Sequence, residues 1–223
     1  MGLQMKKTVI SEHKLADIMF CIDNSGSMED CIDGVRNTVN SFVASLEAGV
    51  QGMSPVDWQI GLLSYSEKTF NFVNLANNTS KFKKELEHYI NGNEFTPGAI
   101  DYAISHTSWR TGAQRIIVVF TNEILETGVP ADESAKGFDK LINKIVDSHI
   151  QIIYYGPNCR YYSQFNKCPK GEVNVVRGFS GISFGDLMNR LAVTISSGNA
   201  FSGKDSVVKD MVYDLSRITI NQK

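Results

Sequence analysis

Residues 15–28 read LADIMFCIDNSGSM, and the predicted fold depends on the pattern in this stretch. The segment 15–22 is apolar apart from Asp17, which is typical of a strand buried on both faces of a parallel sheet. The run ends in the turn-forming residues 23–27, and apolar residues at helical spacing follow at once. Strand, polar turn and helix place the turn at the carboxyl end of a strand, where open α/β sheets bind ligands. The apolar helical positions are Ile32, Val35, Val39, Phe42, Val43 and Leu46.

The rest of the chain repeats this alternation of buried strands and amphipathic helices. Residues 68–75, KTFNFVNL, alternate apolar and polar side chains, so we expect an edge strand that pairs antiparallel with its predecessor. We therefore predict an α/β fold, with a doubly wound, mainly parallel sheet, one antiparallel edge strand and helices on both faces. The other predicted strands are 58–65, 115–121, 150–155 and 172–176, and the other predicted helices are 77–90, 96–109, 135–149 and 184–195.

The first turn carries a carboxylate and two hydroxyls at alternate positions, Asp23, Ser25 and Ser27. Oxygen ligands in this array suit a hard divalent cation. The simpler interpretation is that Asp23 or Ser27 only caps the following helix. An EF-hand loop is excluded, because Met28 and Gly34 stand where that loop needs its glycine and glutamate. An aspartyl phosphotransferase is also disfavoured, because Ser25 stands where a second acid is needed.

Two further loops carry oxygen-bearing side chains at the ends of predicted elements. Thr96 precedes Pro97 at the start of a predicted helix, where it can act as the N-cap. The strand 115–121 ends in Thr121-Asn122-Glu123. Loops at the carboxyl ends of parallel strands meet at one edge of the sheet, so we expect these residues near Asp23.

Composition limits the classes of function. The chain has 223 residues, of which 42% are hydrophobic, and a net charge of −2, so nothing favours nucleic-acid binding. No apolar stretch reaches the roughly 18 residues of a membrane span, and the polar start MGLQMKKTVISEHK has no secretory core, so we expect a cytoplasmic protein. We expect an N-terminal arm at 1–14, one domain at 15–198 and a tail with helical apolar spacing at 199–223.

Residues 159–168, CRYYSQFNKC, form a predicted loop after the strand 150–155, which we call the 159–168 loop. Cys159 and Cys168 can form a disulfide or half a zinc site, but two free thiols are the expectation in a reducing cytosol. Arg160 and Tyr162 are candidate partner-binding residues, because arginine and aromatic side chains are enriched in binding hot spots. The alternative is that the rings of this loop only cover the sheet.

The three loops together resemble the von Willebrand factor type A domain with its metal-ion-dependent adhesion site. The D-x-S-x-S motif stands at Asp23, Ser25 and Ser27, and Thr96 matches the threonine of the middle loop. The resemblance implies that these residues bind one Mg²⁺ or Mn²⁺ ion, with Asn122 at the third motif, and that a partner's Asp or Glu completes the coordination. Among such domains the chain is similar to the stand-alone bacterial TerY-type proteins. That similarity implies a cytosolic module working with a protein kinase or phosphatase in stress response or phage defence.

The third motif departs from the family pattern, because Asn122 stands where the family has an aspartate. With Asp23 alone, a bound dication leaves the site at a formal charge of about +1, so we expect weaker metal binding and stronger attraction to an incoming carboxylate. Glu123 could swing in and restore the missing charge, but it follows on an extended strand end, so we expect its side chain to point to the other side. We predict a non-enzymatic binding module. The alternatives are a structural subunit with a vestigial metal site and a metal-assisted hydrolase.

Overall fold

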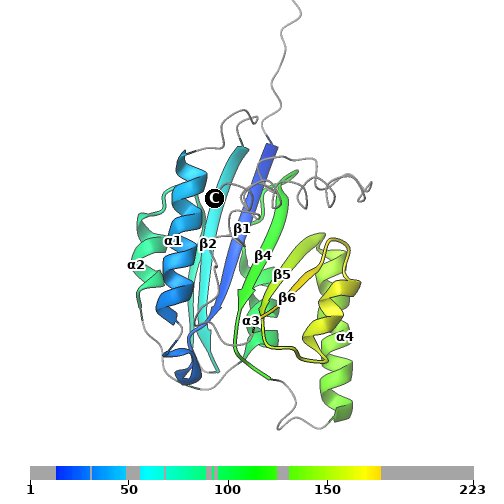
Figure 1. Cartoon of the computed structure of the whole chain (residues 1–223). Coiled ribbons are helices and arrows are strands. Elements are labelled where there is room, and N and C mark those ends of the chain that lie inside the picture. Colours follow the sequence, from blue (N-terminus) through cyan, green and yellow to red (C-terminus); the bar gives the residue numbers. More distant parts are fainter. Residues whose placement is uncertain are drawn as a thin grey trace, which may run out of the picture.

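One sheet organises the part of the chain that the computed structural model describes, residues 14–30, 32–48, 56–67, 69–88, 92, 95–124 and 131–176. Its six strands lie in the order β3-β2-β1-β4-β5-β6 (Figure 1). All neighbouring strands are parallel except β2 and β3, which are antiparallel. The predicted α/β fold with one antiparallel edge strand is therefore confirmed. The strands are β1 (Lys14–Asp23), β2 (Val56–Ser66), β3 (Thr69–Ala76), β4 (Gln114–Phe120), β5 (Ile150–Gly156) and β6 (Glu172–Val175).

Helices cover both faces of this sheet. Short 3₁₀ helices lie in two loops, η1 (Gly26–Met28) after β1 and η2 (Tyr162–Lys167) within the 159–168 loop. Among the described residues, no helix is both long enough and apolar enough to cross a bilayer. The α-helices are α1 (Ile32–Ala48), α2 (Ser80–Leu86), α3 (Thr96–His106) and α4 (Ala131–Asp147).

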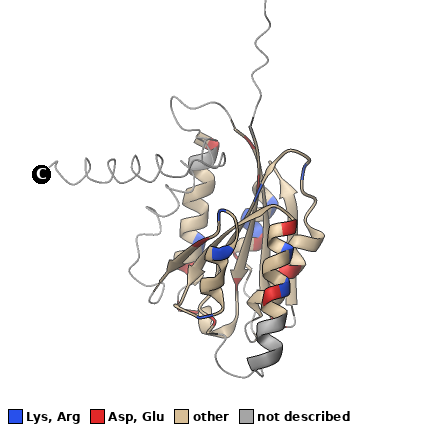
Figure 2. Cartoon of the chain, turned by 90° about the vertical axis from the view of Figure 1, so that its right-hand side faces the viewer, with Lys and Arg blue, Asp and Glu red and all other residues tan. Residues whose placement is uncertain are grey.

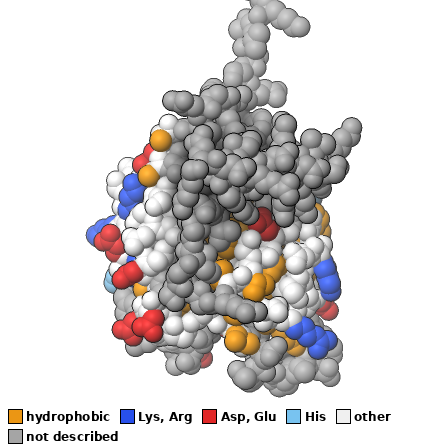
Figure 3. Space-filling view, in the orientation of Figure 1, with side chains coloured by type: hydrophobic (Ala, Val, Ile, Leu, Met, Phe, Trp, Pro, Cys, Tyr) orange, Lys and Arg blue, Asp and Glu red, His pale blue; other side chains and the backbone are white. Residues whose placement is uncertain are grey.

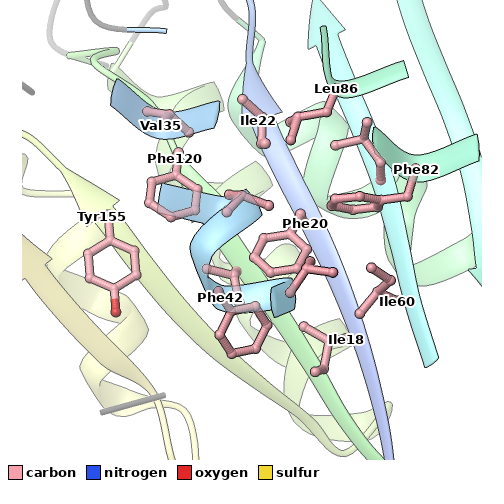
Figure 4. Close-up of a cluster of buried hydrophobic side chains, with 14 of the residues drawn as sticks. Ile18, Phe20, Ile22, Val35, Phe42, Ile60, Phe82, Leu86, Phe120 and Tyr155 are labelled. Carbon is pink, nitrogen blue, oxygen red and sulfur yellow. The ribbon is translucent and has the colours of Figure 1, made fainter. Parts of the chain in front are cut away.

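The central strand β1 is buried on both faces, which explains its continuous apolar run. Phe20 lies in the cluster that faces α1 and α2, and its ring packs edge-on against Phe42 and Phe82 at centroid distances of 5.6 and 5.7 Å (Figure 4). The alternate residues Met19 and Cys21 lie in the cluster that faces α3 and α4. Both clusters are thus built on alternate side chains of one strand.

Asp17, the polar residue within this run, is held by an ion pair. Its side chain is fully buried and accepts hydrogen bonds from Arg110 Nε at 2.6 Å and from the Arg110 backbone N–H at 2.7 Å. The same guanidinium donates to Asp57 on β2 at 2.9 Å. These contacts join β1, β2 and the loop before β4 at the edge of the sheet opposite the β1–α1 turn.

The surface of the described residues carries mixed charge. On the face in Figure 3, acidic and basic side chains are interspersed, and the described residues there form no continuous basic patch. Acidic and basic residues also alternate along the exposed side of α4 (Figure 2), where Asp139, Lys140 and Asp147 are exposed.

Three predicted helices differ in extent from the observed ones. α4 spans Ala131–Asp147 instead of the predicted 135–149. α3 ends at His106, before Trp109, because Thr107 adopts an extended backbone. α2 spans Ser80–Leu86 and is shorter than the predicted 77–90. The predicted helix 184–195, the tail 199–223 and residues 1–13 of the predicted arm lie outside the described residues.

Candidate metal centre

The loop after β1 is folded by its own polar side chains. The Ser25 backbone N–H donates to Asp23 Oδ1 at 3.0 Å, closing a tight turn that starts at the last residue of β1. Asn24 Nδ2 donates to Ser64 Oγ at 2.9 Å and to the His88 carbonyl at 2.7 Å. Asn24 therefore fixes the loop to β2 and to the chain after α2, a positioning role that the sequence analysis did not assign. Asp23, Asn24 and Ser25 are buried, whereas Ser27 is exposed.

A chain of buried hydroxyls connects Asp23 to the start of α3. Thr121 Oγ1 donates to Asp23 Oδ2 at 2.6 Å, and Thr96 Oγ1 donates to Thr121 Oγ1 at 3.0 Å. Tyr65 OH lies 2.7 Å from Thr96 Oγ1. Because the single proton of Thr96 is directed to Thr121, Tyr65 is the donor in this last contact. Every proton of the chain therefore points toward the carboxylate of Asp23.

Asp23 is a buried acid in this arrangement. Burial raises its pKa from 3.8 to about 6, although hydrogen bonds from Thr121 and Ser25 act in the opposite direction, and the charge of Glu123 raises it further. Burial and the charge of Asp23 also raise the pKa of Tyr65 well above its ordinary value of 10.0, so this phenol keeps the proton that it donates. A cation beside Asp23 would stabilise the ionised carboxylate that burial disfavours.

Thr96 does not cap α3, so that interpretation of the sequence is wrong. The helix begins at Thr96 itself, Phe95 occupies the N-cap position, and no side-chain bond from the N-cap residue is present. The Thr96 backbone N–H donates to Glu123 Oε2 at 3.0 Å, so a carboxylate from the β4–α4 loop satisfies this helix start. Because the Thr96 hydroxyl makes no capping bond, it is free to take part in the hydrogen-bonded chain that leads to Asp23.

Asn122 forms a two-point contact with Ser27. Asn122 Oδ1 accepts from Ser27 Oγ at 2.9 Å, and Asn122 Nδ2 donates to the Ser27 carbonyl at 2.8 Å. An aspartate cannot make the second bond, because an ionised carboxylate only accepts. Ser27 Oγ also lies 3.1 Å from Ser25 Oγ. All the predicted metal-site residues, Asp23, Ser25, Ser27, Thr96 and Asn122, thus belong to one hydrogen-bonded network that includes Thr121.

Glu123 lies beside this network, and the expectation that it points away is wrong. Its Oε2 accepts from Thr96 N–H and from Tyr162 OH, the latter at 2.6 Å. β4 ends at Phe120, so the alternation of side chains along a strand no longer applies three residues later. Burial, followed by the charge of Glu123, raises the pKa of Tyr162 well above its ordinary value, so the phenol remains a donor.

The 159–168 loop packs onto the sheet, which corrects the expectation for Tyr162. This side chain is fully buried, stacks on Tyr154 at a centroid distance of 4.8 Å and contacts Phe165 and Phe138. Tyr162 therefore offers no exposed contact surface. Arg160 is exposed, and its role as a partner contact stays a prediction. Cys159 and Cys168 are buried free thiols, and burial raises the pKa of Cys168 to about 11.

The donor set fits a hard divalent cation. A buried carboxylate and three hydroxyls, those of Ser25, Ser27 and Thr96, offer only oxygen ligands, which Mg²⁺ and Mn²⁺ prefer. Within the described part of the chain, no group of three or more His, Cys, Asp or Glu side chains gathers at one place. Because of its oxygen donors, the hydroxyl-rich network around Asp23 is the candidate metal centre, and coordination by these residues stays a prediction.

Comparisons with known proteins agree with the observed fold. The family model described as the von Willebrand factor type A domain matches residues 17–178. Sequence comparison with curated proteins gives no match.

Solved structures of this type share the fold at low identity. The SpRpn10 VWA domain superposes with a TM-score of 0.61 at 18% identity, over 82% of this chain and 98% of that chain. The pilus adhesin SpaC from Lactobacillus rhamnosus GG, in an open conformation, gives 0.62 at 15% identity over 82% of this chain. Proximal thread matrix protein 1 from the mussel byssus, with a zinc-occupied MIDAS motif, gives 0.61 at 13% identity over 81% of this chain. The chain spans 30% of the adhesin and 46% of the mussel protein.

Proposed function

Because the chain belongs to the von Willebrand factor type A family, we propose that it is a protein-binding module that uses a divalent cation. Domains of this family commonly mediate protein–protein interactions and commonly bind a divalent metal. Here Asp23, Ser25, Ser27 and Thr96 would hold Mg²⁺ or Mn²⁺, with Asn122 in the outer shell. The cation would attract a carboxylate, so the partner presents an Asp or a Glu. No catalytic role is assigned to these residues.

The observation that carries this proposal is the buried carboxylate of Asp23 at the end of a hydroxyl chain. Hydrogen bonds from Thr121 and Ser25 hold both of its oxygens in place, so little reorganisation is needed when a cation arrives. The pKa of Asp23 is raised because burial disfavours its ionised form, and a bound cation would stabilise that form. A helix cap alone would not require a buried acid with this network.

Cation binding is tested by titrating Mn²⁺ into the chelator-treated protein by calorimetry and by following the melting temperature. At a Mn²⁺ concentration of about 100 Kd, native-state binding stabilises the fold by about 2.7 kcal/mol. For a domain of this size, this amounts to roughly 5–11 °C. Ser25→Ala is expected to abolish the shift, whereas Ser41→Ala, on an exposed position of α1, should keep it. A wild-type protein that takes up no Mn²⁺ would refute the proposal.

Partner recognition is tested on an array of peptides, with and without Mg²⁺. Binding should require Mg²⁺, and replacing the Asp or Glu of a bound peptide by Asn or Gln should abolish it. Peptides that bind equally well in chelator would contradict a cation-mediated contact. As a finer proposal, supported by the similarity to TerY-type proteins, the partner is a protein kinase or phosphatase of a bacterial stress-response or phage-defence system, and the module acts in the cytoplasm.

A structural subunit with a vestigial site is the second candidate, and one observation favours it. The two-point contact between Asn122 and Ser27 satisfies polar groups at the mouth of the site without any cation. Under this alternative, the Ser25→Ala variant would retain partner binding. A metal-assisted hydrolase has less support, because His106 stacks on Tyr102 at the end of α3 and His149 directly precedes β5, at the opposite end of that strand from the site.

A further inference from the structure

We infer that Glu123, rather than Asn122, supplies the second negative charge of the cation site. This inference rests on the proposed function, because it concerns the same cation. Asp23 and Glu123 together carry two negative charges, which match the charge of one dication. The sequence alone suggests a site with a single acid, and the structure places a second acid beside Thr96, one of the predicted ligands.

Two fixed donors hold the Glu123 carboxylate at this place. The backbone N–H of Thr96 and the hydroxyl of the buried Tyr162 both donate to Oε2, at 3.0 and 2.6 Å. The backbone N–H of Glu123 also donates to Thr121 Oγ1 at 3.0 Å, and Thr121 in turn donates to Asp23. Only the Thr121 hydroxyl therefore separates the backbone of Glu123 from the carboxylate of Asp23.

The neighbouring Asn122 has a different task that requires a neutral amide. Its Nδ2 donates to the Ser27 carbonyl, and a carboxylate at this position would face that carbonyl oxygen with the same sign of charge. Positions 122 and 123 thus divide two functions between them. Asn122 fastens the loop that carries Ser27, and Glu123 provides the charge.

The opposing interpretation is that Glu123 only satisfies the first turn of α3. A helix start needs an acceptor but no second donor, and Tyr162 is a second donor to the same oxygen. The two interpretations differ in their dependence on charge. Capping survives replacement of the carboxylate by an amide, because the amide oxygen still accepts from Thr96 N–H, whereas support of a dication does not.

The test measures Mn²⁺ affinity by calorimetry for wild type, Glu123→Gln and Glu172→Gln. Glu172 is a matched control, an exposed glutamate on β6, which is separated from β1 by β4 and β5. We expect Glu123→Gln to weaken Mn²⁺ binding by about tenfold to a hundredfold, the range found for groups that support metal ligands, and Glu172→Gln to bind like wild type. The melting temperature of the metal-free Glu123→Gln variant should stay close to that of wild type.

The outcomes separate this inference from the proposed function. Wild-type binding with an unchanged affinity in Glu123→Gln would overturn the inference and leave the proposed function intact, whereas a wild type that binds no Mn²⁺ would overturn both. Tyr162→Phe gives an independent measurement if Glu123→Gln does not fold, because it keeps the charge and removes one of the two donors. It is expected to weaken Mn²⁺ binding several-fold, and an unchanged affinity would overturn the tethered arrangement.

Discussion

Replacing the buried acid by an amide, Asp23→Asn, should change how the stability of the metal-free protein depends on pH. The pKa of Asp23 is about 6 in the folded protein and 3.8 as an unperturbed group, so the folded state binds the proton more tightly than the unfolded state. Stability from this residue is therefore fully present below about pH 4 and is lost as the pH rises toward 6 and above. The asparagine variant carries no such proton and lacks this dependence.

The size of the effect follows from the two pKa values. Their difference, at about 1.36 kcal/mol per pKa unit, corresponds to about 3 kcal/mol of unfolding free energy in total, of which roughly 2.4 kcal/mol is lost between pH 4 and pH 7. Asp23 is fully buried, so solvent screening reduces this figure little. Other carboxylates and histidines titrate in the same range in both proteins, and the difference between wild type and Asp23→Asn removes their contribution.

The assay is urea unfolding in chelator, followed by circular dichroism at intervals from pH 4 to pH 7.5. Relative to Asp23→Asn, wild type should lose roughly 2.4 kcal/mol of unfolding free energy as the pH rises over this range. Saturating Mg²⁺ should restore stability mainly at the high end, where Asp23 is ionised and able to bind a cation. Two stability curves that run parallel over this range would refute the reasoning, because Asp23 would then titrate alike in the folded and unfolded states.

Other substitutions give further expectations. Thr121→Val should lower the free energy of unfolding by roughly 2–4 kcal/mol in urea, because the Thr121 hydroxyl takes part in three hydrogen bonds, two of them buried. The buried hydroxyl of Thr107 has no hydrogen-bond partner among the described residues, so Thr107→Val should stay within about 0.5 kcal/mol of wild type. Asn122→Asp should lower the unfolding free energy of the metal-free protein by about 1 kcal/mol, and calorimetry should show no tighter Mn²⁺ binding. A variant that binds Mn²⁺ about tenfold more tightly than wild type would mean that the wild-type site lacks a second negative charge. Tyr162→Ala should cost roughly 3–5 kcal/mol in the same urea assay, because it empties a packed site. Arg160→Ala should leave stability within about 0.5 kcal/mol and weaken only the Mg²⁺-dependent binding of acidic peptides, so a large stability loss would assign Arg160 to packing.

The sequence predicted the sheet well because the signal for each strand lies within a short stretch of neighbouring residues. A continuous apolar run indicates the doubly buried β1, and strict alternation indicates the antiparallel edge strand β3. The sequence also predicted that Asp23, Ser25, Ser27 and Thr96 lie close together, because strand ends in a parallel sheet meet at one edge. That they bind a metal ion stays a prediction. The predicted extents of α2, α3 and α4 were less accurate, because the signals for a helix end are weaker than those for its apolar face.

The parts that the sequence missed depend on contacts between distant segments. Thr96 looked like a helix cap, but the acceptor for its backbone N–H is Glu123, which lies 27 residues further along the chain. Glu123 itself was assigned to the wrong side because the alternation rule was extended beyond the end of β4. Tyr162 looked like an exposed contact residue, since composition does not reveal which aromatic side chain of a loop turns toward the core.

The hydrogen bond between Thr121 and Asp23 joins residues 98 positions apart, and this separation has a consequence for folding kinetics. β1 is synthesised first, yet it occupies the middle of the sheet and must wait for β4 to pair with it. Closing a loop of this length costs chain entropy before the contacts between β1 and β4 can offset it. We therefore expect the pairing of β1 with β4 to be one of the slow steps of folding. An intermediate that contains only β1, β2 and β3 has Asp23 without Thr121, Asn122 or Glu123. The proposed cation site therefore forms only when β4 has paired with the central strand, and a bound ion would mark the molecules that have completed this step.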